Sequence, residues 1–269
     1  MLSVLPVGDI RVADDSDFRK LKNLGDDTDN WKLEYQKNCT SVWTKNNEVS
    51  SFKIVKVRTT FEDIAAEVLY DVLHDPEYRK TWDHSMLEGY EICAINPNND
   101  IGYYALKSPP PLRNRDFVTQ RSWLDMGKEK WILNHSVNHE SCPPRKGYIR
   151  GISYLTGYLV RDQGENKCQF TYVSQSDPRG KLPVWVVNKA TKILAPKIIT
   201  RIQKACKGYP RWKAQNNPHL KPWIFPEQMT LPRLDMAQIK PLAAGVSCES
   251  LDESGINEDD VDADKYVND

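Results

Sequence analysis

The chain has 269 residues, 39% of them apolar, which is enough for one large domain with a sizeable core or at most two small domains. Its 37 basic and 37 acidic side chains cancel, which argues against a protein that binds nucleic acid through a global positive field. No stretch approaches the roughly 18 consecutive apolar residues that a membrane-spanning helix needs.

The chain begins with an arm, a short helix and a pair of strands. Residues 1–13 are expected to be flexible, and Ser16 is a typical N-cap for the helix that follows. Segments 40–45 and 51–59 alternate apolar and polar residues. This alternation predicts two neighbouring antiparallel strands.

The clearest predicted element is an amphipathic helix. Thr60 with Asp63 resembles a capping box at its start. Apolar residues then recur at helical spacing and share one face, namely Phe61, Ile64, Ala65, Val68, Leu69, Val72 and Leu73. Asp75 and Pro76 end this helix, and Pro76 is expected to start a second short helix.

The middle of the chain reads as a series of antiparallel hairpins. Its segments are rich in aromatic and β-branched residues and are separated by clusters of Pro, Asn, Asp and Gly. The predicted strands are 86–94, 101–107, 115–124, 130–138, 147–160 and 167–175.

The C-terminal third is predicted to contain one long helix and a tail. Segment 183–206 has a one-sided apolar pattern, and Pro196 is expected to kink it. A proline-rich stretch follows at 218–232, and the acidic residues from 249 onward indicate a disordered tail. The order of elements fits an α+β fold, with one curved antiparallel sheet against a long C-terminal helix and room for a ligand between them.

Three separate blocks resemble the START (StAR-related lipid transfer) family, and within it the phosphatidylcholine-transfer branch. They are LYDVLHDPEYRKTWD at 69–83, IGYYALKSPPPLRNRDFV at 101–118 and DPRGKLPVWVVNKATKILAPK at 177–197. The resemblance implies a helix-grip START fold, in which a curved antiparallel sheet wraps a long C-terminal helix around a tunnel for one lipid. The resemblance covers roughly residues 15–225, and with the patterns above it gives three expected regions: an arm over 1–13, a START domain over 14–225 and a tail over 226–269.

The resemblance further implies a head-group site at Arg79 and Asp83, which lie four residues apart in YRKTWD. Arginine suits a buried phosphodiester because its planar fork binds two phosphate oxygens and keeps its charge. Side chains at i and i+4 share one helix face, so Asp83 can orient the guanidinium. The alternative is a surface ion pair that contributes roughly 0–1 kcal/mol.

The same resemblance places aromatic head-group positions at Tyr104 and Phe117, with a third near Val173 or Ser174 and Tyr172 beside it. A quaternary ammonium has no N–H to donate and is recognised by aromatic faces. The third position is not an aromatic residue in this chain, so strict choline selectivity is not expected. The alternative for each ring is ordinary packing in the core or the tunnel wall.

A motif of three polar residues, Asn114, Arg115 and Asp116, follows a proline run. An arginine beside an aspartate can be catalytic in other settings, but here the resemblance implies a structural role, holding a loop at the tunnel mouth. His135 and His139 have HxxxH spacing, but in a strand they lie about 13 Å apart, too far for one zinc ion. No metal and no cofactor are expected.

The net neutrality of the chain conceals a basic helix and an acidic tail. Between Asp177 and Glu227 there are eleven basic residues and no acidic one. The basic helix is also the lid that the resemblance implies, so it is expected to dock on anionic membranes and open there. The residues assigned to this role are Lys189, Lys192, Lys197, Arg201 and Lys204. Ser250, at the head of an SLDE stretch, is a candidate phosphorylation site, and the tail is expected to fold back on the basic helix.

Taken together, these patterns predict a carrier of one phosphatidylcholine or phosphatidylethanolamine molecule, not an enzyme. It is expected to be a cytoplasmic monomer that contacts membranes transiently and binds no nucleic acid. The six scattered cysteines and the absence of a signal-peptide pattern support that location. Three alternatives remain open: a module for a sterol or ceramide, a lipid-sensing scaffold without efficient transfer, and an enzyme on the same fold.

Overall fold

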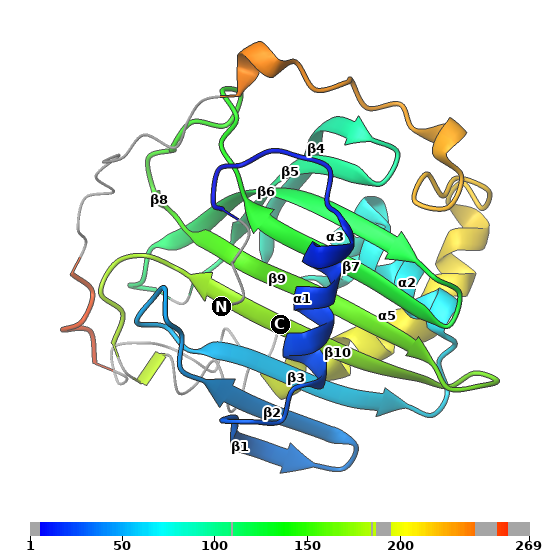
Figure 1. Cartoon of the computed structure of the whole chain (residues 1–269), viewed down its shortest axis with the longest axis horizontal. Coiled ribbons are helices and arrows are strands. Elements are labelled where there is room, and N and C mark those ends of the chain that lie inside the picture. The colour runs from blue at the N-terminus through cyan, green and yellow to red at the C-terminus, as the bar shows by residue number, and fades with distance from the viewer. Residues whose placement is uncertain (1–5, 109, 184, 187–194, 240–251, 258–269) are drawn as a thin grey trace.

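A computed structural model describes most of the chain, and Figure 1 shows its architecture. The described residues are 6–108, 110–183, 185–186, 195–239 and 252–257. The predicted Lys189, Lys192 and Ser250 lie outside them.

Ten strands form one sheet in the order β1-β2-β3-β10-β9-β7-β6-β5-β4, with β8 pairing parallel to β6. Because β10 pairs with β3, the last strand inserts between the two halves of the sheet and joins them. The strands are β1 (Lys32–Lys37), β2 (Thr40–Lys45), β3 (Ile54–Phe61), β4 (Met86–Asn96), β5 (Asn99–Leu106), β6 (Asn114–Asp125), β7 (Glu129–Ser136), β8 (Tyr148–Arg150), β9 (Ile152–Asp162) and β10 (Cys168–Asp177).

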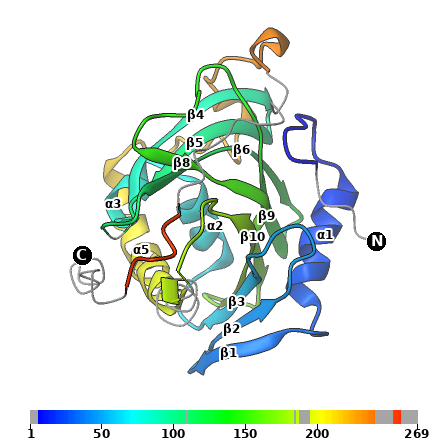
Figure 2. The same ribbon diagram turned by 90° about the vertical axis from the view of Figure 1, so that its left-hand side faces the viewer.

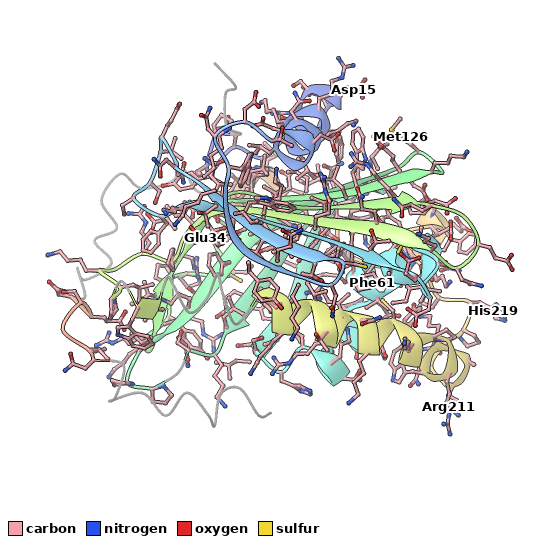
Figure 3. All side chains as sticks on the ribbon, turned by 90° about the horizontal axis from the view of Figure 1, so that it is seen from below. Asp15, Glu34, Phe61, Met126, Arg211 and His219 are labelled. Atoms are coloured by element: carbon pink, nitrogen blue, oxygen red, sulfur yellow. The ribbon has the colours of Figure 1, made fainter. Side chains whose placement is uncertain are left out.

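The helices divide between the two faces of this sheet. Helix α1 packs on β7, β9 and β10, whereas α5 packs on α2 and α3 beneath the opposite face (Figures 2 and 3). Their bounds are α1 (Asp15–Asp26), α2 (Ala66–His74), α3 (Pro76–Trp82) and α5 (Ala195–Gln215), followed by the short 3-10 helices η2 (Pro226–Gln228) and η3 (Met236–Gln238). The predicted helix-grip fold is confirmed.

Successive side chains of each strand point to opposite faces of the sheet, so each strand contributes to two different cores. Phe18 and Leu21 of α1 pack on the outer face, where Val173 is fully buried. Gly157 is required there, because a Cβ at this position would lie 2.5 Å from a methyl carbon of Leu21. The inner face and the buried side of α5 form the larger core, which includes Tyr70, Trp123, Ile132, Phe170, Ile202 and Tyr209.

Two helix starts differ from the prediction. The N-cap of α1 is Asp14, whose carboxylate accepts the amide protons of Ser16 and Asp17, so Ser16 lies inside the helix. Helix α2 begins at Ala66 without a side-chain cap. The proposed capping box is wrong because its Thr60 belongs to β3 and pairs with β10, and the strand ladder satisfies its backbone instead.

Strand β1 and the long helix also differ from the prediction. The polar sequence KLEYQK of β1 carries no alternation signal, and its pairing with β2 defines it. The long helix runs to Gln215, beyond the predicted end at residue 206. Pro196 is the second described residue of α5, and Pro210 lies inside the helix. Residues 187–194 of the predicted helix lie outside the described residues.

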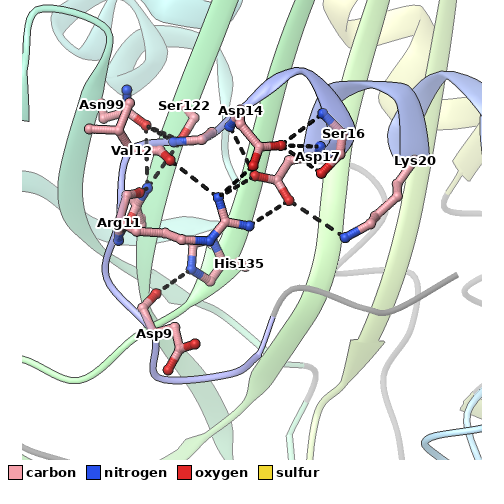
Figure 4. Close-up of polar contacts among 12 residues, drawn as sticks. Asp9, Arg11, Val12, Asp14, Ser16, Asp17, Lys20, Asn99, Ser122 and His135 are labelled. Atoms are coloured by element: carbon pink, nitrogen blue, oxygen red, sulfur yellow. Dashed lines mark hydrogen bonds and ion pairs between the residues drawn. The ribbon is translucent and has the colours of Figure 1, made fainter.

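The described part of the N-terminal arm is bonded to the outer face of the sheet, which differs from the flexible arm predicted (Figure 4). His135 hydrogen-bonds through Nε2 to the carbonyl oxygen of Asp9 at 2.8 Å. Gln120 donates to the carbonyl of Arg11 at 2.6 Å, and Arg11 forms an ion pair of 2.6 Å with the buried Asp17. This network extends the packed domain toward the N-terminus.

The described tail residues are also bonded to the domain. Residues 232–234 run beside the edge strand β4, where the amide of Ala94 donates to Pro232 and its carbonyl accepts from Leu234. Glu253 is buried beside the start of β6. The Pro-containing segment is therefore attached to the sheet, and the disorder predicted from residue 249 onward does not hold at Glu253.

Candidate functional site

Arg79 and Asp83 lie where α3 meets the inner face of the sheet. Pro76 starts α3, and the Asp75 side chain caps it by accepting the amide of Tyr78. Arg79 Nη1 lies 3.5 Å from Asp83 Oδ2, and Arg79 Nη2 donates to the carbonyl of Leu73 at 2.9 Å. Only 21% of the arginine side chain and 11% of the aspartate side chain are exposed, so this is not an ordinary surface pair.

Tyr104 joins this pair from strand β5. Its hydroxyl donates to Asp83 Oδ2 at 2.7 Å. Burial and then the negative charge of Asp83 raise the pKa of Tyr104 well above its ordinary value, so the phenol remains a donor. Burial disfavours the charged guanidinium, but the negative charge of Asp83 opposes this effect, and the pKa of Arg79 is raised. The site therefore keeps a fixed cation beside a fixed anion.

Phe117 lies directly opposite Tyr104 in the pairing of β5 with β6. Side chains paired in this way point to the same face of a sheet. The ring of Phe117 occupies the space over Gly151, where a Cβ would lie 2.4 Å from ring carbon Cε1. The tertiary structure thus brings four predicted positions onto one face: Arg79, Asp83, Tyr104 and Phe117.

Tyr172 faces the same side of the sheet but lies apart from Tyr104. Strands β10 and β5 are four strand spacings apart, which is about 19 Å along a flat sheet. Tyr172 stacks on Tyr158 of β9, with their ring centroids 5.4 Å apart. Val173 lies on the opposite face under α1 and is excluded from the site.

Tyr158 is a site residue that the sequence reasoning missed. It stacks on Tyr172 from strand β9, which lies between β10 and β5 in the sheet. It therefore lies between the two groups of predicted residues. The only signal in the sequence was its inward position in an alternating strand, which many core residues share.

A second buried charge cluster lies on the inner face and was also missed. Arg121 Nη2 lies 2.6 Å from Glu91 Oε1, and Arg121 also forms an ion pair with Asp100. Burial raises the pKa of Asp100, while the two carboxylates outweigh burial and raise the pKa of Arg121. Arg121 shares strand parity with Phe117 and pairs directly opposite Asp100. In the sequence, the signal for this cluster was that Asp100 and Arg121 both fall at inward positions of neighbouring strands.

His74 lies beside these residues without a hydrogen-bond partner. Among the residues that the structure describes, neither ring nitrogen has one, and 1% of the residue is exposed. Its ring contacts Tyr70, Trp123 and Trp223. Burial and then the charge of Arg121 lower its pKa well below the ordinary value, so His74 is neutral near pH 7.

The inner face is not completely covered by the described part of the chain. Tyr104, Tyr158 and Tyr172 remain half-buried, although their strands are flanked on both sides and helices cover this face. The described part of the chain therefore leaves part of each of these three rings uncovered. This face combines aromatic rings with the Arg79–Asp83 pair and the Arg121 cluster, a chemistry suited to an amphiphile with an anionic group. Within the described ranges, no three His, Cys, Asp or Glu side chains form a metal-binding group.

Helix α5 carries the described residues of the predicted membrane-docking set. Ile199, Ile202 and Ala205 are buried against the core, whereas Lys204 is exposed. Lys197 and Arg201 are half-buried. The C-terminal half of α5 is held to the domain by polar contacts with a buried carboxylate.

That anchor is a buried carboxylate at the junction of α2 and α3. Asp75 Oδ2 accepts from Lys213 Nζ at 2.9 Å and from the hydroxyl of Tyr209 at 3.1 Å. Asp71 accepts from Lys221 at 2.6 Å and from the indole of Trp223 at 2.8 Å. These bonds fix the end of α5 and the segment after it against α2.

A comparison with protein families matches the START domain model to residues 11–213, three quarters of the chain. The chain belongs to the START domain family. START domain-containing protein 10 of Homo sapiens is 44% identical over 250 residues, which cover 93% of this chain and 86% of the relative. Phosphatidylcholine transfer protein of Bos taurus is 30% identical over 184 residues, which cover 66% of this chain and 85% of the relative.

Solved START structures agree with this fold. The crystal structure of human STARD10 superposes with a TM-score of 0.81 and 44% sequence identity, covering 86% of this chain and 96% of that chain. Human StAR-related lipid transfer protein 5 superposes with a TM-score of 0.64 at 22% identity, covering 71% of this chain and 93% of that chain, a likeness of fold. Across the described ranges, no helix combines the length and apolar character of a membrane span.

Proposed function

We propose that this START domain carries one glycerophospholipid, phosphatidylcholine or phosphatidylethanolamine, and exchanges it between membranes without breaking a bond. The observation that carries the proposal is the arrangement of Arg79, Asp83 and Tyr104 on the inner face. The similarity to a phosphatidylcholine transfer protein supports the same lipid class.

Electrostatics favours a phosphodiester at Arg79. An anion taken out of water needs a fixed counter-charge, because an unpaired buried charge costs several kcal/mol. Arg79 Nη2 is bonded to the carbonyl of Leu73, and Nη1 faces Asp83. Asp83 balances the arginine when no ligand is bound, and it faces the positive amine when a zwitterionic lipid is bound.

The acyl chains explain why such a carrier needs no catalyst. Two chains of about 16 carbons carry roughly 25 kcal/mol of transfer free energy at about 0.8 kcal/mol per methylene. The bilayer supplies a similar amount, so an apolar interior makes net exchange nearly neutral. The carrier accelerates transfer by removing the step in which the chains contact water.

Helix α5 supplies the membrane contact in this proposal. Lys197, Arg201 and Lys204 are the described members of its basic set, and each basic residue near an anionic surface contributes about 1 kcal/mol. The helix packs over the inner face, so docking there places the membrane next to the lipid site.

The decisive experiment is native mass spectrometry of the protein purified from eukaryotic cells, with chemical identification of the released ligand. We expect one phosphatidylcholine or phosphatidylethanolamine per chain. Arg79→Ala should then lose most transfer of fluorescent phosphatidylcholine between vesicles, whereas Lys80→Ala, one residue away and exposed in its pair with Glu77, should keep it.

Two outcomes would contradict the proposal. A sterol or ceramide as the bound ligand would replace the phospholipid with another lipid class. A protein that is empty and extracts no lipid from vesicles would remove the carrier function and leave a membrane-recruited scaffold.

A further inference from the structure

A short segment of the acidic tail is built into the domain at the end of the sheet where β10 finishes. Residues 252–257 lie beside the turn that follows β10 (Figures 1 and 2). The amide of Glu253 donates to the carbonyl of Lys181 at 3.0 Å, and the indole of Trp185 donates to the carbonyl of Ile256 at 2.8 Å. The partners Lys181 and Trp185 belong to the basic run that precedes α5, and residues 187–194 of the predicted basic helix lie outside the described residues.

The centre of the contact is a buried ion pair between Glu253 and Arg115. Glu253 Oε2 lies 2.5 Å from Arg115 Nη2, and the two side chains are 3% and 5% exposed. Glu253 Oε1 accepts the amide proton of Arg113 at 2.8 Å. Both carboxylate oxygens are therefore used. The burial of both side chains distinguishes this contact from the exposed pair of Lys181 with Asp252 in the same segment.

Arg115 needs this carboxylate. Its other hydrogen bonds go to the carbonyl oxygens of Arg113, Pro178 and Arg179, which are neutral acceptors. The neighbouring Asp116 carboxylate is occupied by Arg150, which binds both of its oxygens. A buried guanidinium without a counter-charge is strongly unfavourable. The tail thus completes the charge balance of a residue inside the domain.

The position of this pair connects the tail to the lipid site. Arg115 is two residues before Phe117 on β6, so both point to the inner face. Two of the carbonyls that Arg115 holds, those of Pro178 and Arg179, belong to the turn leaving β10, which leads along the chain to α5. A clamp at this point ties the segment that precedes the proposed lid helix to the sheet beside the proposed head-group site.

We propose that Glu253 is an intramolecular clamp, a tail residue that holds the turn after β10 against Arg115 and thereby slows opening of the lipid site. Its effect on transfer rests on the proposed lipid-carrier function, whereas its effect on the turn does not. When the acidic segment leaves this position, Arg115 and Lys181 lose their acidic partners and form a basic surface.

The test uses the full chain with Glu253→Gln, which keeps the shape and removes the charge. We expect the amides of Arg113 and Glu253 to exchange hydrogen at least about fivefold faster, the lower end of typical coupling factors. Transfer of fluorescent phosphatidylcholine between neutral vesicles should accelerate in the same variant. Asp252→Asn, which alters the exposed pair in the same segment, should change neither quantity appreciably.

A second variant covers the case in which Glu253→Gln does not fold. Trp185→Phe removes the hydrogen bond to Ile256 and leaves the ion pair intact, and it should accelerate both readouts by a smaller factor. Unchanged amide exchange in a folded Glu253→Gln would overturn the clamp. Faster exchange with unchanged transfer would overturn its control of opening. A wild-type protein that transfers no phospholipid would instead count against the proposed function, and amide exchange would still decide the clamp.

Discussion

The hydroxyl of Tyr104 donates a 2.7 Å hydrogen bond to the carboxylate of Asp83, which connects a strand in one half of the sheet to the end of α3. The same carboxylate oxygen faces Arg79 at 3.5 Å. Asp83 is therefore shared by a neutral donor and a cation. The strength of the ion pair between Asp83 and Arg79 therefore depends on the hydrogen bond that the Tyr104 hydroxyl donates to Asp83.

Two substitutions at Tyr104 separate its hydroxyl from its ring. Tyr104→Phe removes the donor, so Asp83 pairs more strongly with Arg79. Phosphatidylcholine transfer should fall by about tenfold or more, which corresponds to the loss of one hydrogen bond to a charged group, about 1.5–3 kcal/mol. Tyr104→Leu also removes the aromatic face, which binds quaternary ammonium groups. The ratio of phosphatidylcholine to phosphatidylethanolamine transfer should fall only in the leucine variant. Equal ratios in both variants would exclude a role of the ring in choline recognition.

Asp75→Asn should destabilise the domain by removing the anchor of α5. The buried Lys213 loses its counter-charge, and breaking a buried pair in this way costs about 3 kcal/mol or more. Urea denaturation followed by tryptophan fluorescence measures the change. Glu77→Gln, which removes an exposed pair on the same helix, is the matched control and should unfold at nearly the wild-type midpoint. Equal midpoints for both variants would refute the anchor.

His74 should make stability fall at acid pH. Burial lowers its folded pKa well below 6.5, so below that value the unfolded chain takes up a proton that the folded chain does not. Stability therefore falls as pH decreases below about 6.5, by up to about 1.4 kcal/mol per pH unit for this group. His74→Phe should flatten the fall measured between pH 7 and 5, whereas changing the exposed His84 to Gln should not. Parallel curves would contradict the assignment.

Lys56 should make the stability of the domain depend on pH in the alkaline range. Burial lowers its pKa to about 8, from an ordinary value of 10.5, and its ammonium lies 4.0 Å from the ring centre of Trp31. Between these two values the unfolded chain binds the proton and the folded chain does not, so stability rises with pH. The rise totals about 3 kcal/mol.

Replacing Lys56 with Met should remove this rise, and denaturation at pH 7.5, 9 and 10.5 measures it. Lys53→Met changes a side chain that is 46% exposed and should leave the rise in place. A rise that persists in Lys56→Met would assign it to another group.

Much of the fold was predictable because its signals are local. The strands of the middle hairpins follow from alternation and turn residues, and the START blocks carry Arg79 and Asp83 at a spacing that one helix face requires. The expected structural role of Arg115 and Asp116 agrees with their bonds to Pro178 and Arg150. Where the wrong element was predicted, as at Thr60, pairing with a distant strand overrode the local pattern.

The fold family and the polar pair at Arg79 and Asp83 follow from the amino-acid sequence, since both depend on short-range spacing and recognisable motifs. Three-dimensional packing settled which aromatic residues join that pair, because a step of one residue in a strand moves a side chain to the opposite face: Tyr172 faces inward and Val173 lies under α1. It also decided that Glu253 meets Arg115 across 138 residues, because a buried guanidinium is satisfied by whichever carboxylate the chain brings to it.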